Sequence, residues 1–263
     1  MSDLGLMLVQ NQASLADFSE RVDWLDQMLS RQKLEAIDLV SLPELFCSGY
    51  NIGSAIYDCA AERTGKFYKT MTELAQRHQI AIHYGYPELS NGTLYNSAQM
   101  IDSSGEIILN YRKRLIPPGV EEGVFSNGKH DSIVTFKGVK IATLICYDAE
   151  FPENVRRVAV NGAELILVPT ALSAQWGVVA EKVIPSRAFE NGVYLCYTNQ
   201  SGSENDMLYY GGSCIVDPQG TDLARLNTQE GIITATISTE VVRRAQARLP
   251  YCSVSQKFFK DKL

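Results

Sequence analysis

Hydrophobic and polar positions along the chain follow two periods, which predict strands and helices in alternation. Residues 4–10 (LGLMLVQ) and 164–169 (ELILVP) are short apolar runs with the length of buried strands. Residues 18–33 instead repeat apolar side chains at helical spacing, so a helix over this segment has one apolar face. That face carries Val22, Leu25, Met28 and Leu29. The chain therefore begins with a strand followed by an amphipathic helix.

Glycine, proline and short polar turns divide the rest of the chain into further elements. Residues 103–106 (SSGE) indicate a hairpin turn, and Pro152 marks the first turn of a helix that ends before Gly162. Gly192 ends another helix. Further strands are expected at residues 38–43, 80–86, 94–102, 107–113, 132–136, 140–146, 193–199 and 231–237, with a hairpin at 211–226. Further helices are expected at residues 66–78 and near the C-terminus.

The order of these elements predicts the fold class. Strands that alternate with helices, together with interspersed hairpins, indicate an α/β protein with mixed sheets. More than ten strands in a chain of 263 residues indicate two sheets rather than one. No linker rich in proline, glycine or serine divides the chain, and no repeat of fixed period occurs. We therefore expect residues 1–263 to form a single domain.

Composition and charge exclude several classes of function. The net charge of −6 and the short basic segment at 243–248 (RRAQAR) give no surface for nucleic acid or anionic lipid. Residues 1–10 do not resemble a signal peptide, and no apolar run is long enough to span a membrane, so a cytoplasmic protein is expected. No two cysteines form a C-x-x-C pair, and the chain has only three histidines, which predicts reduced thiols and no metal site. The six cysteines are Cys47, Cys59, Cys146, Cys196, Cys214 and Cys252.

Three predicted strands end in side chains that carry chemistry. Glu44, Lys113 and Cys146 each follow an apolar or alternating run directly. In open α/β sheets, ligands bind beyond the carboxyl ends of the strands. We therefore expect a carboxylate, an ammonium and a thiol to lie together at one edge of the sheet. Taken singly, each has an ordinary structural explanation, because buried cysteines and solvated charges at strand ends are common.

Together, the three side chains suit nucleophilic catalysis without a histidine. Glu44 in a shielded place would have a raised pKa and serve as general base and general acid. Lys113 would stabilise a tetrahedral oxyanion, with the backbone N–H of Tyr147 as a second donor. The positive charge of Lys113 and the Tyr147 N–H, if it points toward the sulfur, would favour the thiolate form of Cys146.

Three segments resemble the signature segments of the nitrilase superfamily, the carbon–nitrogen hydrolases. They are residues 42–50 (LPELFCSGY), 111–119 (YRKRLIPPG) and 144–153 (LICYDAEFPE), and they occur in the family's order at fitting separations. Later blocks of the family are matched by 169–176 (PTALSAQW) and 186–199 (SRAFENGVYLCYTN). The resemblance thus covers nearly the whole chain.

The resemblance implies a fold and a catalytic set. The fold is a four-layer α-β-β-α sandwich of two mixed sheets, which usually forms a homodimer through its helical faces and in some relatives a higher homo-oligomer. The catalytic set is Glu44, Lys113 and Cys146, with a thioester acyl-enzyme as intermediate, water as second substrate and neither metal nor organic cofactor. The family's second glutamate corresponds to Glu121, because an aromatic residue and a glycine follow at the family's spacing, whereas Glu122 is one position out of register. Its implied role is to hold Lys113 or the substrate amide.

The residues around Cys146 narrow the substrate class to a small non-peptide carboxamide. Tyr147 after the cysteine is typical of amidases, whereas nitrilases tend to have tryptophan there. Many relatives have an arginine where this chain has Glu150, and some N-carbamoyl hydrolases use arginines here to bind a substrate carboxylate. Glu150 would repel such a group, which favours a neutral or cationic amide, unless Glu150 forms a salt bridge to Arg156 or Arg157.

Several alternatives stay open at this point. An N-carbamoyl amidohydrolase or an ω-amidase is the main alternative, followed by a nitrilase or a catalytically silent interaction protein. A nucleotide-binding function is disfavoured, because the chain contains no glycine-rich phosphate-binding motif. The helical spacing of Arg187 and Glu190 predicts a structural ion pair. The expected pocket wall, besides Glu150, consists of Tyr50, Tyr147, Thr170 and Trp176.

Overall fold

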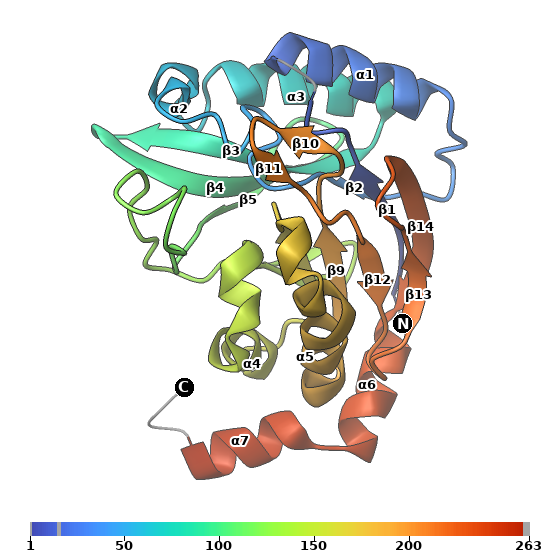
Figure 1. Cartoon of the computed structure of the whole chain (residues 1–263). Coiled ribbons are helices and arrows are strands. Elements are labelled where there is room, and N and C mark those ends of the chain that lie inside the picture. The colour runs from blue at the N-terminus through green and yellow to red at the C-terminus, as the bar shows by residue number, and fades with distance from the viewer. Residues whose placement is uncertain (1, 15–16, 260–263) are drawn as a thin grey trace.

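Two six-stranded sheets form the centre of the computed structural model, which describes residues 2–14 and 17–259 (Figure 1). The first sheet contains β1 (Asp3–Gln10), β2 (Leu39–Ser41), β3 (Ala81–Ser90), β4 (Thr93–Ile101), β5 (Ile107–Arg112) and β14 (Gly231–Ser238), in the order β14-β1-β2-β3-β4-β5. The second contains β6 (Ile133–Phe136), β7 (Val139–Thr143), β8 (Leu165–Pro169), β9 (Tyr194–Thr198), β12 (Cys214–Val216) and β13 (Asp222–Arg225), in the order β13-β12-β9-β8-β7-β6.

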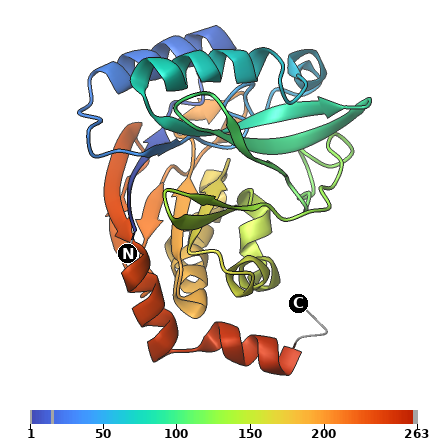
Figure 2. The same ribbon diagram turned by 180° about the vertical axis from the view of Figure 1, so that it is seen from behind.

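Helices cover the outer face of each sheet. The helices α1 (Phe18–Ser30) and α3 (Lys66–His78) lie on the first sheet, and α4 (Pro152–Val160) and α5 (Ile184–Asn191) lie on the second (Figures 1 and 2). The helix α2 (Ala55–Cys59) lies beside α3 at the end of the first helical layer, whereas α6 (Thr239–Arg248) and α7 (Tyr251–Phe259) lie outside both layers (Figures 1 and 2). The predicted α-β-β-α sandwich of two mixed sheets is confirmed.

The apolar run of β1 is explained by burial on both faces. Leu4, Leu6 and Leu8 belong to the core between the two sheets, whereas Met7 and Val9 pack in the core beneath α1 and α3. Successive side chains of a strand point to opposite faces, so a strand covered on both sides needs apolar residues throughout. The sequence pattern of β1 therefore reports its position inside the sandwich.

Parallel pairing brings strand ends together. The strands β1, β2 and β3 are parallel, and β5 runs the same way because β4 is antiparallel to both of its neighbours. In the second sheet, β7, β8 and β9 are parallel. The loops after β2, β5, β7 and β8 carry the chemistry described below.

The structure differs from the sequence prediction at two prolines and in two short elements. The strand β2 ends at Ser41, because Pro43 cannot donate a hydrogen bond to a neighbouring strand. The single C-terminal helix expected from the sequence is two helices, separated at Pro250. The helix α2 and the small hairpin of β10 (Ser203–Glu204) and β11 (Met207–Leu208) were not predicted.

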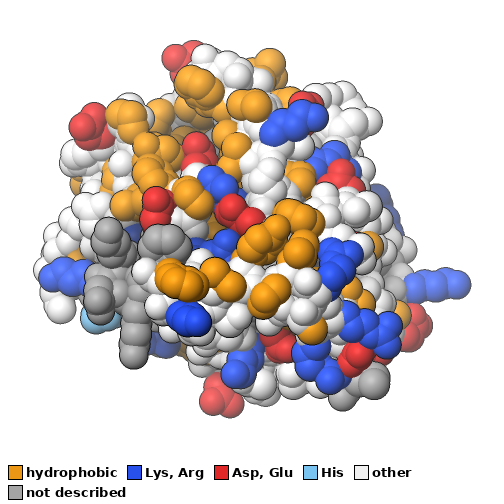
Figure 3. Space-filling view, turned by 90° about the horizontal axis from the view of Figure 1, so that it is seen from below, with side chains coloured by type: hydrophobic (Ala, Val, Ile, Leu, Met, Phe, Trp, Pro, Cys, Tyr) orange, Lys and Arg blue, Asp and Glu red, His pale blue; other side chains and the backbone are white. Residues whose placement is uncertain are grey.

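The face that carries α7 exposes hydrophobic side chains (Figure 3). On that helix, Tyr251, Val254 and Phe258 are exposed. The homodimer expected from the family resemblance stays a prediction. Among the residues that the structure describes, no helix has the length and hydropathy that a bilayer-spanning helix needs.

A buried histidine links the two sheets. The His83 ring on β3 lies 3.2 Å from Ser41 Oγ and 3.1 Å from Thr143 Oγ1 on β7, and its side chain is inaccessible to solvent. Burial lowers the pKa of His83 to about 3. In the unfolded chain this group titrates at about 6.5, so below that pH the unfolded chain binds a proton that the folded protein does not.

We therefore expect His83 to destabilise the fold in acid. Between pH 6.5 and about 3, its share of the free energy of unfolding should fall by about 1.4 kcal/mol for each pH unit. Urea denaturation of wild type and His83→Gln between pH 7 and pH 4.5 measures this share, because all other titrations are common to both proteins. The variant should lose stability more slowly as the pH falls, and parallel curves would contradict the assignment.

Candidate active site

Close packing between β3 and the loop after β2 fixes the position of Glu44. A side chain at Gly85 would place its Cβ 2.4 Å from the backbone nitrogen of Leu45, so the loop lies directly on the strand. The next residue, Leu45, has a left-handed backbone with φ of 49°. Such a conformation is unfavourable for a non-glycine residue and persists where the surroundings enforce it. Glu44 is thereby held fully buried.

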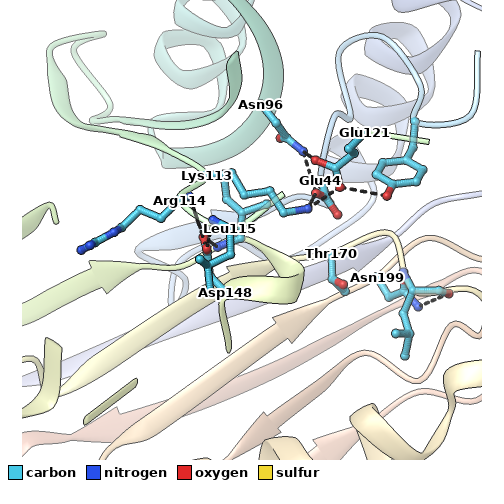
Figure 4. Close-up of polar contacts among 12 residues, drawn as sticks. Glu44, Asn96, Lys113, Arg114, Leu115, Glu121, Asp148, Thr170 and Asn199 are labelled. Atoms are coloured by element: carbon cyan, nitrogen blue, oxygen red, sulfur yellow. Dashed lines mark hydrogen bonds and ion pairs between the residues drawn. The ribbon is translucent and has the colours of Figure 1, made fainter. Parts of the chain in front are cut away.

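Lys113 joins two buried carboxylates. Its Nζ lies 2.7 Å from Glu44 Oε1 and also donates to Glu121 Oε1 (Figure 4). Asn96 Nδ2 donates to both carboxylates, at 2.7 Å to Glu44 Oε1 and 2.9 Å to Glu121 Oε2. These four side chains are inaccessible to solvent. The predicted proximity of Glu44 and Lys113 is therefore present, and Glu121 lies beside them.

Burial and charge set the protonation of this cluster. Burial raises the pKa of Glu44 to about 7, against the opposing effect of Lys113. Burial also works against the ammonium form of Lys113, but the carboxylates of Glu121 and Glu44 outweigh it and raise its pKa. Glu44 Oε2 is buried and has no hydrogen-bond partner among the described residues. One carboxylate oxygen is thus free to accept a proton near neutral pH.

Cys146 lies at a strained turn after β7. It begins a 3₁₀ turn at Cys146–Glu150, and its φ of 45° falls in the left-handed region. The Thr170 side chain and the Ala171 backbone favour the thiolate form of Cys146. Burial, followed by the Glu44 carboxylate, nevertheless raises the pKa of the Cys146 thiol well above its ordinary value. The expected thiolate character is therefore wrong for the resting protein, because Lys113 offsets only part of these effects.

Asp148 ties the loop of Cys146 to the loop of Lys113. Its carboxylate accepts hydrogen bonds from Tyr111 Oη at 2.8 Å, from the Leu115 backbone at 2.8 Å and from the Ile145 backbone at 3.1 Å (Figure 4). Tyr111 and Leu115 flank Lys113 on both sides, and Ile145 precedes the cysteine. A single buried carboxylate thus holds both functional segments in register.

A cavity of about 450 Å³ has Cys146 in its wall. Tyr50, Tyr147, Glu150 and Trp176 line it, as predicted from the sequence. Thr170 does not line it: this residue is fully buried and donates a hydrogen bond to Tyr197 Oη at 3.0 Å. The wall also includes Pro117, Pro118, Gly119, Val120, Ala171, Leu172, Ser173, Gln175 and Met207.

Glu150 keeps its carboxylate at the cavity without a salt bridge among the described residues. Arg156 contacts Cys252 Sγ, and Arg157 pairs with Asp131 at 2.7 Å, so the alternative salt bridge from Glu150 to either arginine is not formed. Arg187 donates to the backbone oxygen of Glu150 at 2.7 Å. The predicted ion pair of Arg187 with Glu190 is confirmed at 3.1 Å. Burial raises the pKa of Glu150, which is half-buried.

Sequence reasoning missed two asparagines that shape the site. The inward-facing positions of β4 are Leu94, Asn96, Ala98 and Met100, so a polar residue interrupts an apolar row. That interruption is the signal that would have identified Asn96. Asn199 accepts from the Leu172 backbone at 2.9 Å and so supports the cavity wall, but nothing in the sequence pattern marks it.

The arrangement suits attack by sulfur on an electrophilic carbon. Cys146 lines the cavity, the Glu44 carboxylate has an oxygen without a hydrogen-bond partner among the described residues, and the buried Lys113 ammonium supplies positive charge. In the described part of the chain, no group of three or more histidine, cysteine, aspartate or glutamate side chains is placed to hold a metal ion.

Known relatives agree with this chemistry. A hydrolase encoded beside pqqF in Pseudomonas protegens is 41% identical over 86% of this chain and 81% of its own length. An (R)-stereoselective amidase of a Pseudomonas species is 33% identical, covering 73% of this chain and 70% of the relative. A 2-oxoglutaramate amidase of Bacillus subtilis is 29% identical over 88% and 90%.

Solved structures share the fold. An amidase from a Nesterenkonia species superposes with a TM-score of 0.85 at 29% identity, over 95% of both chains. A variant of that amidase carries acrylamide on its active-site cysteine. The family model for carbon–nitrogen hydrolases matches residues 7–247. The chain therefore belongs to the carbon–nitrogen hydrolases of the nitrilase superfamily, enzymes that hydrolyse carbon–nitrogen bonds other than peptide bonds.

Proposed function

We propose that the protein is an amidase that converts a small carboxamide to a carboxylic acid and ammonia through a thioester on Cys146. The observation that carries this proposal is the cavity-lining thiol beside a buried carboxylate with a free oxygen and a pKa near 7. A base with a pKa near the working pH accepts and returns protons with little cost in either direction. Glu44 therefore supplies what histidine supplies in other thiol enzymes.

The reaction proceeds in two halves. In the first, Cys146 Sγ attacks the amide carbon while Glu44 takes the thiol proton, and the carbonyl oxygen becomes an oxyanion near Lys113 and the Tyr147 N–H. Glu44 then protonates the amide nitrogen, the carbon–nitrogen bond breaks and ammonia leaves. In the second half, Glu44 takes a proton from water, which attacks the thioester. The carbon–sulfur bond breaks, the thiol regains the proton and the acid departs.

In this mechanism Glu121 is a positioning residue. It contacts Lys113 Nζ and is itself held by Asn96 and by Tyr50 Oη at 2.9 Å. Lys113 thus has a carboxylate on two sides, which keeps it charged and restricts its ammonium to one place. A fixed charge costs no reorganisation when the oxyanion forms.

Glu150 favours a neutral or cationic acyl group. Its carboxylate lies in the cavity wall without a cationic partner on its side chain among the described residues, beside the apolar surfaces of Tyr147 and Trp176. A substrate carboxylate would meet like charge there, whereas an amino or hydroxyl group would find an acceptor. The cytoplasmic location, the homodimer and the single domain over residues 1–263 remain predictions beside this one.

Ammonia release from a matched panel tests the proposal. We expect wild type to hydrolyse neutral and amino-bearing aliphatic amides faster than α-keto acid amides, N-carbamoyl amino acids or nitriles. In Glu150→Arg the preference should move toward carboxylate-bearing amides by about 10-fold to 100-fold, because one like charge is replaced by an opposite one. Glu150→Gln, which removes the charge alone, separates repulsion from attraction.

Two outcomes would contradict different parts of this assignment. Preferred release from N-carbamoyl amino acids or α-keto acid amides by wild type would overturn the acyl-group assignment and leave the thioester mechanism in place. Preferred hydrolysis of nitriles would overturn the amidase assignment itself.

A further inference from the structure

We propose that Glu204 is a positioning residue for the reaction and acts on the Lys113 cluster through Tyr50. The inference rests on the proposed function, because it assigns a role in the same catalytic cycle. Glu204 lies at the end of β10, more than eighty positions away in sequence from Glu121, and belongs to no segment that the sequence singled out. Its importance follows from its contacts alone.

The Glu204 carboxylate is buried and holds a segment of backbone. Its Oε2 accepts from the backbone nitrogens of Tyr50 at 3.0 Å and Asn51 at 2.6 Å, and from Tyr209 Oη at 2.8 Å. Only 7% of Glu204 is exposed. Two consecutive backbone donors on one carboxylate oxygen fix the orientation of that peptide segment, since charge-assisted hydrogen bonds are short and strong.

A buried arginine supplies the opposite charge. Arg21 of α1 is 1% exposed, and its Nη2 lies 3.5 Å from Glu204 Oε1. Its Nη1 donates to the backbone oxygen of Phe46 at 3.0 Å. Phe46 follows Glu44 by two positions, so the guanidinium bonds the loop directly near Glu44 and is linked to its Tyr50 end through Glu204. A buried carboxylate requires such a partner, because an unpaired charge in this position is strongly unfavourable.

The loop from Glu44 to Tyr50 connects Glu204 to the cluster around Lys113. Tyr50 Oη donates to Glu121 Oε1 at 2.9 Å, the same oxygen that contacts Lys113 Nζ. Tyr50 also lines the cavity, together with Met207 of β11, the partner strand of β10. Glu204 therefore sets both the hydrogen bond that orients Glu121 and one side of the substrate cavity. A displaced Tyr50 would loosen the Lys113 ammonium and change the shape of the cavity together.

The ordinary alternative is a structural ion pair that only stabilises the β10–β11 hairpin. A double-mutant cycle distinguishes the two roles. We would measure kcat and KM for an amide that wild type hydrolyses, in Glu204→Ala, in Tyr50→Phe and in the double variant. If Glu204 acts through Tyr50, each single change should lower kcat/KM by about 10-fold to 100-fold, because misplacement near 1 Å has effects of that size. The double variant should then be no worse than the more severe single one.

Matched variants keep the test informative. Glu204→Gln keeps an oxygen for the two backbone donors and should recover most of kcat, even though it loses the charge opposite Arg21. Asp38→Ala removes a carboxylate that likewise holds a backbone nitrogen, that of Gly5 at 2.8 Å, but before the start of β2, away from the cluster. It should lower stability and leave kcat unchanged. If Glu204→Ala does not fold, Tyr209→Phe, which removes one donor to Glu204, takes its place in the cycle.

Independent effects would overturn the proposal. If the fold-losses of the two single variants multiply in the double variant, Glu204 does not act through Tyr50. If Glu204→Ala lowers thermal stability with kcat and KM unchanged, Glu204 has a structural role only. Failure of the proposed function is a separate result, seen as absence of hydrolysis by wild type. In that case, the same cycle is measured as the rate of Cys146 alkylation by iodoacetamide, followed by mass spectrometry.

Discussion

Cys146→Ala should lower ammonia release from the best amide by about four to six orders of magnitude, as expected when a covalent nucleophile is removed. The alanine variant keeps Glu44, Lys113 and Glu121, so it retains substrate binding and the charge that faces the oxyanion. It loses the only atom that forms the acyl-enzyme in this mechanism. We therefore expect KM, or the dissociation constant measured by calorimetry, to change far less than kcat.

A buried thiol elsewhere provides the control. Cys214 on β12 is also buried and its pKa is also raised by burial, but it lies outside the cavity wall. Cys214→Ala should retain kcat within about twofold, because substitutions outside a site leave its geometry intact. Mass spectrometry of wild type quenched during turnover should show the acyl group on Cys146. Ammonia release by Cys146→Ala at the rate of wild type would exclude this residue as the nucleophile.

The raised pKa of the Cys146 thiol explains why the neighbouring base must be strong and close. A preformed thiolate would need a surrounding positive charge that exceeds the effect of burial, and here Lys113 is shared between two carboxylates. In the proposed mechanism, the proton stays on sulfur until Glu44, whose Oε2 has no hydrogen-bond partner among the described residues, takes it in the transition state. In this proposal, the sulfur loses its proton only as it attacks the substrate carbon. The resting thiol is therefore less reactive toward other electrophiles, because the thiolate is the reactive form.

The positions of the site residues in the sequence were easier to predict than their protonation. That Glu44, Lys113 and Cys146 each follow a strand could be predicted. The expected meeting at one edge of one sheet was wrong, because β2 and β5 belong to the first sheet and β7, which precedes Cys146, belongs to the second. The protonation of Cys146 could not, since the balance between burial and the charges of Lys113 and Glu44 depends on three-dimensional distances. Thr170 was placed in the cavity wall because it follows β8, yet its side chain turns inward to Tyr197.

Residues that act through tertiary contacts left weaker traces. Asp148 holds two loops through backbone nitrogens, and such contacts have no sequence signature beyond an aspartate in a turn. Asn96 could have been found, because it interrupts an apolar row on β4. Glu204 could not, because the hairpin that carries it has only two residues in each strand and no pattern in the sequence.

Glu44→Gln should remove most of the activity and also the acidic limb of the pH profile, which is the fall of kcat/KM below pH 7. In wild type, the carboxylate form of Glu44 accepts the thiol proton, and burial raises its pKa to about 7. Protonation below that pH blocks the base, so kcat/KM should fall about tenfold for each pH unit below 7 and reach a plateau above it. The glutamine side chain has the same shape and can still accept from Lys113, but it takes no proton. We expect a loss of about 10³-fold to 10⁴-fold at the plateau and a flat profile between pH 5 and 8.

Glu121→Gln separates this role from that of a positioning carboxylate. It should lower kcat/KM by loosening Lys113, yet the acidic limb should persist, because Glu44 still titrates. The limb should also move to lower pH, since a negative charge that raises the pKa of Glu44 has been removed. A Glu44→Gln enzyme that keeps the acidic limb of wild type would show that another group is the base, and the free Oε2 oxygen of Glu44 would then have no catalytic meaning. The direction of the shift in Glu121→Gln therefore decides whether the pKa near 7 belongs to Glu44 and is set by the charges around it.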